Sequence, residues 1–197
     1  MKTERKKSSP KNQKLDRETW LGRSLEALAS KGPQVLTVEK LCRTLGVSRG
    51  SFYWHFKSRA DFVQQLAKFW DHRFTVSLTE TVASAPNGPG QRLLLLSELI
   101  QDIDVIRFDL AVRAWASVEP LAARIVRTTD QTRYQFVRAM FAELGFTGDD
   151  LEMRTRTFVI FYSFDGAFSF KEGTKVMKRQ RLLRYQMLIR KSEQTSG

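Results

Sequence analysis

Residues 36–57 constrain the fold more than any other part of the chain, because they encode two short helices joined by a very tight turn. Thr37 can cap the first helix, and Glu39 favours the positive end of that helix. Gly46 can adopt the left-handed conformation that ends the first helix, and Ser48 can cap the second helix two residues later. This spacing predicts a helix-turn-helix unit.

The apolar and polar side chains of this segment are spaced to form an inner and an outer face. The inner face is expected to contain Val38, Leu41, Leu45, Val47, Phe52 and Phe56. The side chains expected to face outward on the second helix are Arg49, Gly50, Ser51, Tyr53, Trp54 and His55. Such a mixture of aromatic and polar groups is an unusual surface to present to water alone.

The outer face has the chemistry of a helix that enters the major groove of DNA. The first residues of such a helix read bases, and an arginine can pair with both acceptors of guanine. We therefore expect base reading by Arg49, Gly50 and Ser51. Donors suited to phosphate oxygens follow, and they are Tyr53, His55, Lys57 and Arg59. The alternative for Tyr53, Trp54 and His55 is packing between this helix and its neighbours.

Charge is distributed unevenly along the 197 residues, whose formal net charge is +12. Lys and Arg outnumber Asp and Glu by 16 to 7 in residues 1–73 and by 8 to 2 in residues 171–197, but are outnumbered 9 to 12 in between. The basic front favours a polyanionic partner. Residues 1–14 have almost no apolar side chains and are expected to form a disordered basic arm, either solvated or lying along DNA.

The remaining composition favours a cytoplasmic protein. There is no run of 18 apolar residues and no apolar segment behind the N-terminal lysines, so neither a membrane span nor a signal peptide is indicated. The single cysteine, Cys42, cannot form an internal disulfide, which fits a reducing compartment. With two histidines and one cysteine, a zinc site is not expected, and no other cofactor is indicated.

Helical periodicity without alternating strands predicts an all-α protein of about nine helices. Besides the helix-turn-helix pair, helices are expected at about 16–30, 58–83, 91–103, 106–117, 120–144, 149–171 and 174–191. The expected division is a basic arm at 1–14, a three-helix DNA-binding domain at 15–60 and a helical bundle at 61–197.

Residues 16 to about 66 resemble the TetR-like family of bacterial transcriptional regulators, most clearly between Leu36 and Phe62. The runs Leu-Thr-Val-Glu-Lys-Leu, Leu-Gly-Val-Ser and Phe-Tyr-Trp-His-Phe-Lys-Ser-Arg follow the family pattern. The resemblance implies a homodimeric repressor that binds a palindromic operator in double-stranded DNA, with an effector-binding and dimerisation domain in residues 61–197. It also adds a phosphate contact from Thr37. Ser48 and Trp54 complete the expected phosphate-contacting residues.

The C-terminal bundle is rich in aromatic residues, which can pack in the core, line a pocket or contact a partner. The expected lining of an effector pocket is Phe74, Trp115, Tyr134, Phe161, Tyr162 and Asp165. Asp165 interrupts an apolar stripe, so we expect it to find a donor within the protein or on a cationic ligand. The expected dimer interface contains Phe158, Phe168, Leu182, Leu183 and Met187.

The sequence also allows two functions other than that of a regulator. Gly46-Val-Ser-Arg-Gly50 matches the G-x-S-x-G pattern of serine hydrolases, but that motif needs a strand before the serine, so we do not expect an enzyme. A ligand-free structural protein with nonspecific phosphate contacts is the second alternative. The basic C-terminal segment favours it and the aromatic middle of the chain argues against it.

Overall fold

The computed structural model describes residues 15–165 and 173–191, and these ranges are built from helices without strands. The N-terminal end contains α1 (Arg17–Lys31), the 3-10 turn η1 (Pro33–Val35), α2 (Val38–Leu45) and α3 (Arg49–His55). The remaining elements are α4 (Arg59–Asp71), η2 (His72–Val76), α5 (Ser77–Ser84), α6 (Pro89–Asp102), α7 (Val105–Ala116), α8 (Pro120–Glu143), α9 (Gly148–Phe164) and α10 (Thr174–Ile189). Since α4, η2 and α5 form one continuous helix, the described chain has nine helices, which confirms the predicted fold class.

The turn between α2 and α3 has the geometry that its sequence predicts. Thr37 Oγ1 accepts a hydrogen bond from the Lys40 amide at 3.3 Å, and Ser48 Oγ accepts one from the Ser51 amide at 3.1 Å. Gly46 ends α2 in the left-handed region, at φ 68° and ψ 33°. The two caps and the glycine therefore fix the start of α3, where the exposed polar residues are concentrated.

An aromatic cluster holds α1 against α3 and the start of α4. Trp20 makes edge contacts with Phe52 and Phe56, with ring centroids 5.8 and 5.9 Å apart. Phe62 of α4 packs on Phe56 at 5.0 Å. All four rings are almost fully buried. Because rings of this size contribute much of the buried apolar area of a small domain, this cluster is the core of the helix-turn-helix end.

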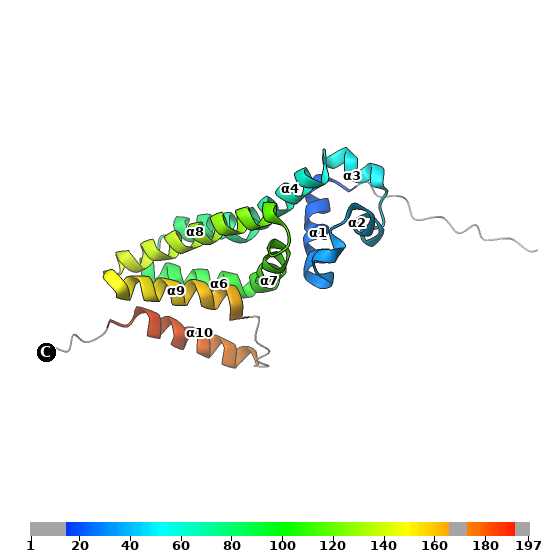
Figure 1. The fold of residues 1–197 in the computed structure, drawn as a ribbon. Coiled ribbons are helices and arrows are strands. Elements are labelled where there is room, and N and C mark those ends of the chain that lie inside the picture. The colour runs from blue at the N-terminus through cyan, green and yellow to red at the C-terminus, as the bar shows by residue number, and fades with distance from the viewer. Residues whose placement is uncertain (1–14, 166–172, 192–197) are drawn as a thin grey trace, which may run out of the picture.

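One continuous helix joins the two ends of the molecule, as the sequence predicts for residues 58–83. It begins beside α3 and runs into the bundle as α4, η2 and α5 (Figure 1). Its middle part, η2, is π-helical, and the Ser77 amide bonds to the carbonyl of His72 five residues earlier. Predicted and observed bounds of this long helix agree within two residues.

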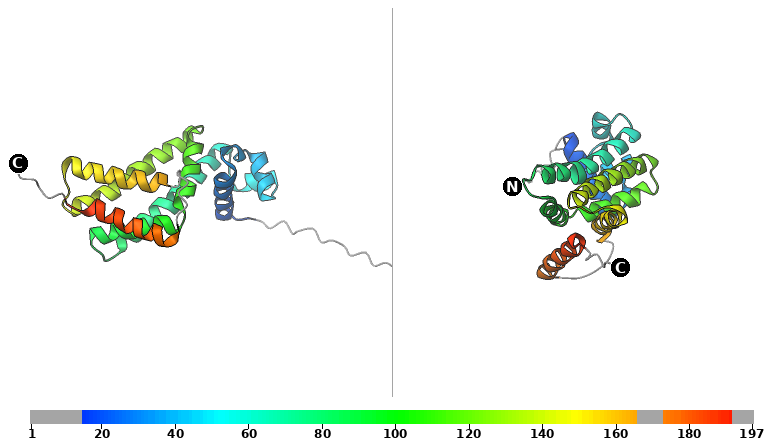
Figure 2. Two further views of the ribbon diagram at one scale, coloured as in Figure 1. Left: turned by 90° about the horizontal axis from the view of Figure 1, so that it is seen from below. Right: turned by 90° about the vertical axis from the view of Figure 1, so that its left-hand side faces the viewer.

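The long helices α8 and α9 pack together in the bundle, and α8 also contacts α4, α6 and α7. Helix α10 lies against α6 at the outer edge of the bundle, as the two further views also show (Figure 2). The largest buried side chains here are Trp70, Trp115 and Phe141. The helix expected at 149–171 is helical to Phe164, and its last six residues lie outside the described ranges. No helix in the described ranges combines the length and apolarity that crossing a membrane requires.

Candidate nucleic-acid interface and candidate pocket

Helix α3 and the residues that follow it present one exposed face, formed by Arg49, Gly50, Tyr53, Trp54 and Lys57. Tyr53 and Trp54 expose 54% and 73% of their surfaces, which is unusual for aromatic residues in a folded domain. Arg49, Gly50, Tyr53 and Trp54 recur at positions three and four apart, so they form a single stripe along α3, and Lys57 lies in the non-helical segment just after it. This face includes five of the expected DNA-contacting residues.

Two residues expected on the outer face point toward the N-terminal part of the domain instead. Ser51 Oγ accepts a hydrogen bond from Trp20 Nε1 at 3.2 Å, and His55 Nε2 lies 2.8 Å from the carbonyl oxygen of Leu15. Ser51 and His55 are therefore half-buried and hydrogen-bonded within the domain, and their contacts with DNA stay predictions. They precede Phe52 and Phe56 on the helix and share the inward side with these rings.

Arg17 fixes the far end of α3. Its Nη2 donates to the carbonyl oxygen of His55 at 2.5 Å, and its guanidinium lies 5.9 Å from the ring centroid of Phe56. A cation at this position is favoured by the negative end of the helix dipole. Sequence analysis missed Arg17, because its contact joins residues 38 positions apart.

Arg49 forms an ion pair with Glu39 at 3.3 Å, across the helix-turn-helix unit. Both side chains are more than half exposed, at 63% and 56%, so solvent screens the pair and its net contribution is small. Because the pair is weak, a guanine edge or a phosphate can compete with Glu39 for Arg49.

The expected phosphate-contacting residues Thr37 and Ser48 both begin helices, and their hydroxyls are used as caps. Arg59 also begins a helix, but its guanidinium contacts the bundle. Its Nη2 lies 2.7 Å from Glu119 Oε2, in the turn between α7 and α8, and Glu119 is 10% exposed. A second ion pair, between Arg107 of α7 and Glu26 of α1 at 3.0 Å, also joins the two ends of the molecule. The phosphate contacts of Thr37, Ser48 and Arg59 stay predictions.

Asp61 closes the start of α4 together with Ser58 and Lys57. The Asp61 amide donates to Ser58 Oγ at 3.1 Å, while Asp61 Oδ2 accepts from the Lys57 amide at 2.8 Å. Hydrogen bonds from the Gln65 side chain and the Lys57 amide hold the pKa of the Asp61 carboxyl below its usual value. This cap sets the chain direction directly after α3.

The expected pocket residues are divided among different places. Phe74 and Tyr162 line one pocket inside the bundle. Phe161 and Asp165 line a separate open hollow between α1, η1, α7, α9 and α10. Trp115 is 1% exposed and belongs to the core. The Tyr134 hydroxyl donates to Glu152, which holds the pKa of Tyr134 above its usual value. Neither Trp115 nor Tyr134 lines the inner pocket.

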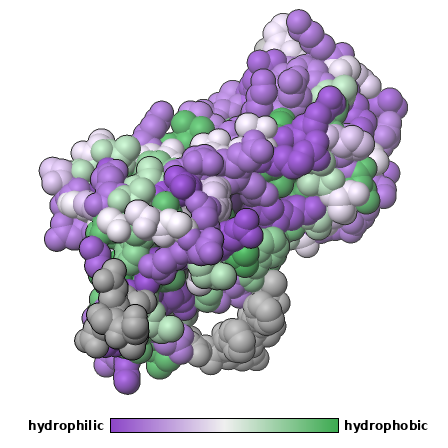
Figure 3. Space-filling model, turned by 60° about the vertical axis from the view of Figure 1, so that its left-hand side comes forward, coloured by the Kyte–Doolittle hydropathy of each residue, from purple (hydrophilic) through white to green (hydrophobic). Residues whose placement is uncertain are grey.

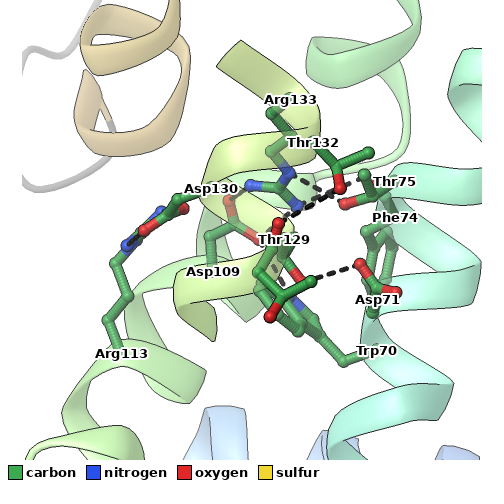
Figure 4. Close-up of polar contacts among 11 residues, drawn as sticks. Trp70, Asp71, Phe74, Thr75, Asp109, Arg113, Thr129, Asp130, Thr132 and Arg133 are labelled. Atoms are coloured by element: carbon green, nitrogen blue, oxygen red, sulfur yellow. Dashed lines mark hydrogen bonds and ion pairs between the residues drawn. The ribbon is translucent and has the colours of Figure 1, made fainter. Parts of the chain in front are cut away.

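A buried ion pair, which Figure 4 shows in close-up, is part of the lining of the inner pocket. Arg133 of α8 donates to both carboxylate oxygens of Asp109 of α7, and its Nε donates to Thr75 Oγ1 at 2.8 Å. Trp70 Nε1 donates to Asp109 Oδ1 at 2.9 Å. Exposure of the side chains is 1% for Asp109 and 14% for Arg133. Sequence analysis missed this group, because the partners come from three helices.

The expected dimer-interface residues also separate into two groups. Phe158 is 4% exposed and packs on Tyr162 with ring centroids 4.5 Å apart, so it belongs to the core of the protomer. Leu182, Leu183 and Met187 are exposed on α10. Phe168 lies outside the described residues. Exposed apolar side chains on α9, which sequence analysis missed, are Met153, Ile160 and Phe164. In a space-filling view, hydrophobic residues lie among hydrophilic ones in the lower part of the molecule (Figure 3).

The serine of the G-x-S-x-G pattern lies in the turn after α2, so a helix precedes it and the strand of a hydrolase motif is not there. Its hydroxyl caps α3, and His55 is hydrogen-bonded to Leu15. The pattern is thus a by-product of the glycine and the capping serine that build the turn.

Comparison with known proteins agrees with this geometry. A family model described as bacterial regulatory proteins, tetR family, matches residues 21–66. The tetracycline repressor protein class C of Escherichia coli is 38% identical over 55 residues, which span 28% of this chain and only 25% of that protein. The match therefore concerns the helix-turn-helix end alone.

Solved structures extend the similarity of fold to nearly the whole chain. A TetR family transcriptional regulator from Thermus thermophilus superposes with a TM-score of 0.67 at 16% identity, over 91% of this chain and 100% of that one. A transcriptional regulator from Rhodococcus sp. Rha1 gives 0.66 at 17% identity, over 88% and 94%. At such identities the similarity concerns the fold.

The fold and the exposed face of α3 define a protein with a helix-turn-helix unit followed by a helical bundle. More specifically, residues 21–66 match the model of the tetR family, and the fold of the described residues resembles that of a solved TetR-family regulator.

Proposed function

We propose that this chain is a sequence-specific, DNA-binding transcriptional regulator, a repressor that leaves a palindromic operator when a small effector binds. The observation that carries the proposal is the exposed face formed by Arg49, Gly50, Tyr53 and Trp54 of the capped helix α3 and by Lys57 just after it. Residues 15–60 are proposed as the DNA-binding domain and residues 61–197 as the effector-binding and dimerisation domain. The assigned roles are base reading for Arg49 and Gly50 and phosphate binding for Tyr53, Trp54 and Lys57.

A homodimer is supported by the apolar side chains that α9 and α10 expose. These are Met153, Ile160, Phe164, Leu182, Leu183 and Met187. Large apolar surfaces on soluble proteins mark contacts with partners, and two-fold symmetry lets two recognition helices read two inverted half-sites. One short helix contacts only a few base pairs, so pairing also supplies the specificity that a single protomer lacks.

Effector control is supported by the long helix that begins beside α3 and lines the inner pocket further along. Arg59 starts this helix and pairs with Glu119, whereas Phe74 of η2 lines the pocket. A ligand that binds one arrangement of this helix more tightly than the other shifts the protein toward that arrangement. The fraction of dimers able to bind DNA changes by an amount that depends on the difference between the two affinities.

The test is selection of binding sites from random duplexes, followed by footprinting. We expect an inverted repeat, with Arg49→Ala losing preference at one position of each half-site by about 5- to 150-fold, which corresponds to about 1 to 3 kcal/mol. Tyr53→Phe should weaken binding to all sequences alike. Arg127→Ala, at an exposed arginine of α8, is the control and should bind as the wild type does. Equal loss on every duplex for Arg49→Ala and Tyr53→Phe would contradict the assigned roles.

A ligand-free structural protein that binds DNA through phosphates alone is the second candidate. The observation that favours it is the exposed basic surface of α10, with Lys175, Lys178 and Arg179. Affinities for selected and random duplexes at two salt concentrations separate the candidates. Phosphate-only binding falls steeply with salt and shows no preference between the duplexes.

A further inference from the structure

The inner pocket lies among the helices of the bundle. Side chains of η2, α5, α6, α7, α8 and α9 line it, and most of them are aliphatic or aromatic. The centres of water-sized groups can occupy about 50 Å³ of it, so the pocket is narrow. A ligand that fits is therefore small and mostly apolar.

Asp109 and Arg133 are the charged side chains among the described residues that line this pocket. They neutralise each other, since the guanidinium donates to both carboxylate oxygens. Trp70 Nε1 adds a third donor to the carboxylate, and the Phe74 carbonyl oxygen accepts from Arg133 Nη2 at 3.3 Å. The polar end of the pocket thus carries no net charge, and its charged atoms are already hydrogen-bonded.

This neutrality decides which head group the pocket accepts. A carboxylate would place a second anion beside a guanidinium that Asp109 already occupies, and an ammonium would lie beside Arg133 with no anion of its own. Either ion would lose its hydration without gaining a counter-ion, and burial of an unpaired charge is strongly unfavourable. An uncharged head group avoids this cost.

Thr75 supplies the hydrogen bond that an uncharged head group needs. Its hydroxyl is 1% exposed, lines the pocket and has one proton and two lone pairs, of which Arg133 Nε uses one lone pair. A ligand hydroxyl or carbonyl can therefore bond to the Thr75 hydroxyl without disturbing the ion pair. The rest of the lining, including Leu78, Leu96 and Val137, suits an alkyl or aromatic body.

We propose that the inner pocket binds a small uncharged amphiphile, whose apolar body fills the pocket and whose single hydroxyl or carbonyl group bonds to Thr75. This inference rests on the proposed effector function and names the class of molecule that would act as effector. Pairing within the Asp109–Arg133 group is what excludes charged molecules of the same size.

The test compares three probes of eight carbon atoms each, 1-octanol, octanoate and octylamine, on the full-length protein at pH 7. We expect 1-octanol to raise Tm by about 3 to 6 °C at ten times its Kd, and the two ions to bind at least tenfold more weakly. Equal or tighter binding of either ion, or no binding of 1-octanol, overturns the proposal.

A pair of neighbouring variants on α9 locates the binding. Val159 lines the pocket, whereas Thr157 is exposed and does not. Val159→Phe should abolish the 1-octanol shift, and Thr157→Phe should retain it. Retention of the shift in both variants overturns the proposed location. The probe series on the wild-type protein tests the ligand class even if Val159→Phe fails to fold.

A separate measurement of DNA binding distinguishes this inference from the function on which it rests. If 1-octanol binds with the expected ranking but leaves affinity for the selected duplex unchanged, the ligand class stands and effector-controlled release fails. If the charged probes bind better and also release the DNA, release stands and the ligand class fails.

Discussion

The substitution Asp109→Asn tests whether the buried ion pair stabilises the bundle. It keeps the shape of the side chain and an acceptor for Trp70 Nε1, but it removes the charge opposite Arg133. Removing one partner of a buried pair costs about 3 to 5 kcal/mol, because the other charge stays buried. Since Arg133 is 14% exposed and an acceptor remains, we expect the lower limit, about 3 kcal/mol.

The expected loss is a fall in Tm of about 6 to 12 °C for a chain of this size. Asp130→Asn is the matched control, because Arg113 and Asp130 form a similar two-bond pair between the same two helices. Asp130 is 38% exposed, so water can replace it, and the control should lose about 1 kcal/mol or less.

Urea unfolding at pH 7, followed by circular dichroism, gives the free energies of unfolding for both variants. Similar losses for Asp109→Asn and Asp130→Asn would refute the reasoning, because the predicted difference arises from burial alone. The double variant Asp109→Leu with Arg133→Met should recover much of the loss, since replacing both charges by apolar groups removes the unpaired ion.

Three further substitutions test the helix-turn-helix end. Gly46→Ala should cost about 1 to 2 kcal/mol in urea unfolding, because φ is 68°, whereas Gly22→Ala in the middle of α1 should not destabilise. The folded state lowers the pKa of the Asp61 carboxyl, so this group stabilises the protein fully above its unfolded pKa and loses that effect as pH falls through its folded pKa. Asp61→Asn should therefore be less stable than the wild type at neutral pH, and the difference in free energy of unfolding between the two proteins should shrink between about pH 5 and pH 3. Ser51→Ala should cost about 1 kcal/mol by removing the acceptor of Trp20 Nε1, while the preferred operator sequence stays unchanged; a changed preference would assign Ser51 to base reading.

Local sequence was sufficient to predict the helix-turn-helix unit. Thr37, Gly46 and Ser48 act on residues no more than a few positions away, so their effect does not depend on the rest of the fold. The direction of Ser51 and His55 was not predictable in the same way. It depends on where α1 brings Trp20 and Leu15, which lie 31 and 40 positions away from their partners.

The bundle illustrates the same limit. Aromatic residue types indicate burial, but they do not distinguish core from pocket: Trp115 lies in the core, Tyr162 lines the inner pocket and Phe161 lines the open hollow. The pairing of Asp109 with Arg133 joins two helices and has no local sequence signal. The burial of this charged pair depends on how α4, α7 and α8 pack together.

The π-helical segment η2 separates two surfaces of the long connecting helix. Its i to i+5 hydrogen bond includes one residue more than an α-helical turn, so the residues beyond Val76 are rotated by about 100° relative to an uninterrupted α-helix. Phe62 and Leu66 before this turn pack in the buried core, and Leu78 after it lines the inner pocket. A single extra residue therefore changes which residues of the helix face the inner pocket. The residues that pack against the helix-turn-helix end lie before η2, so their positions are not affected.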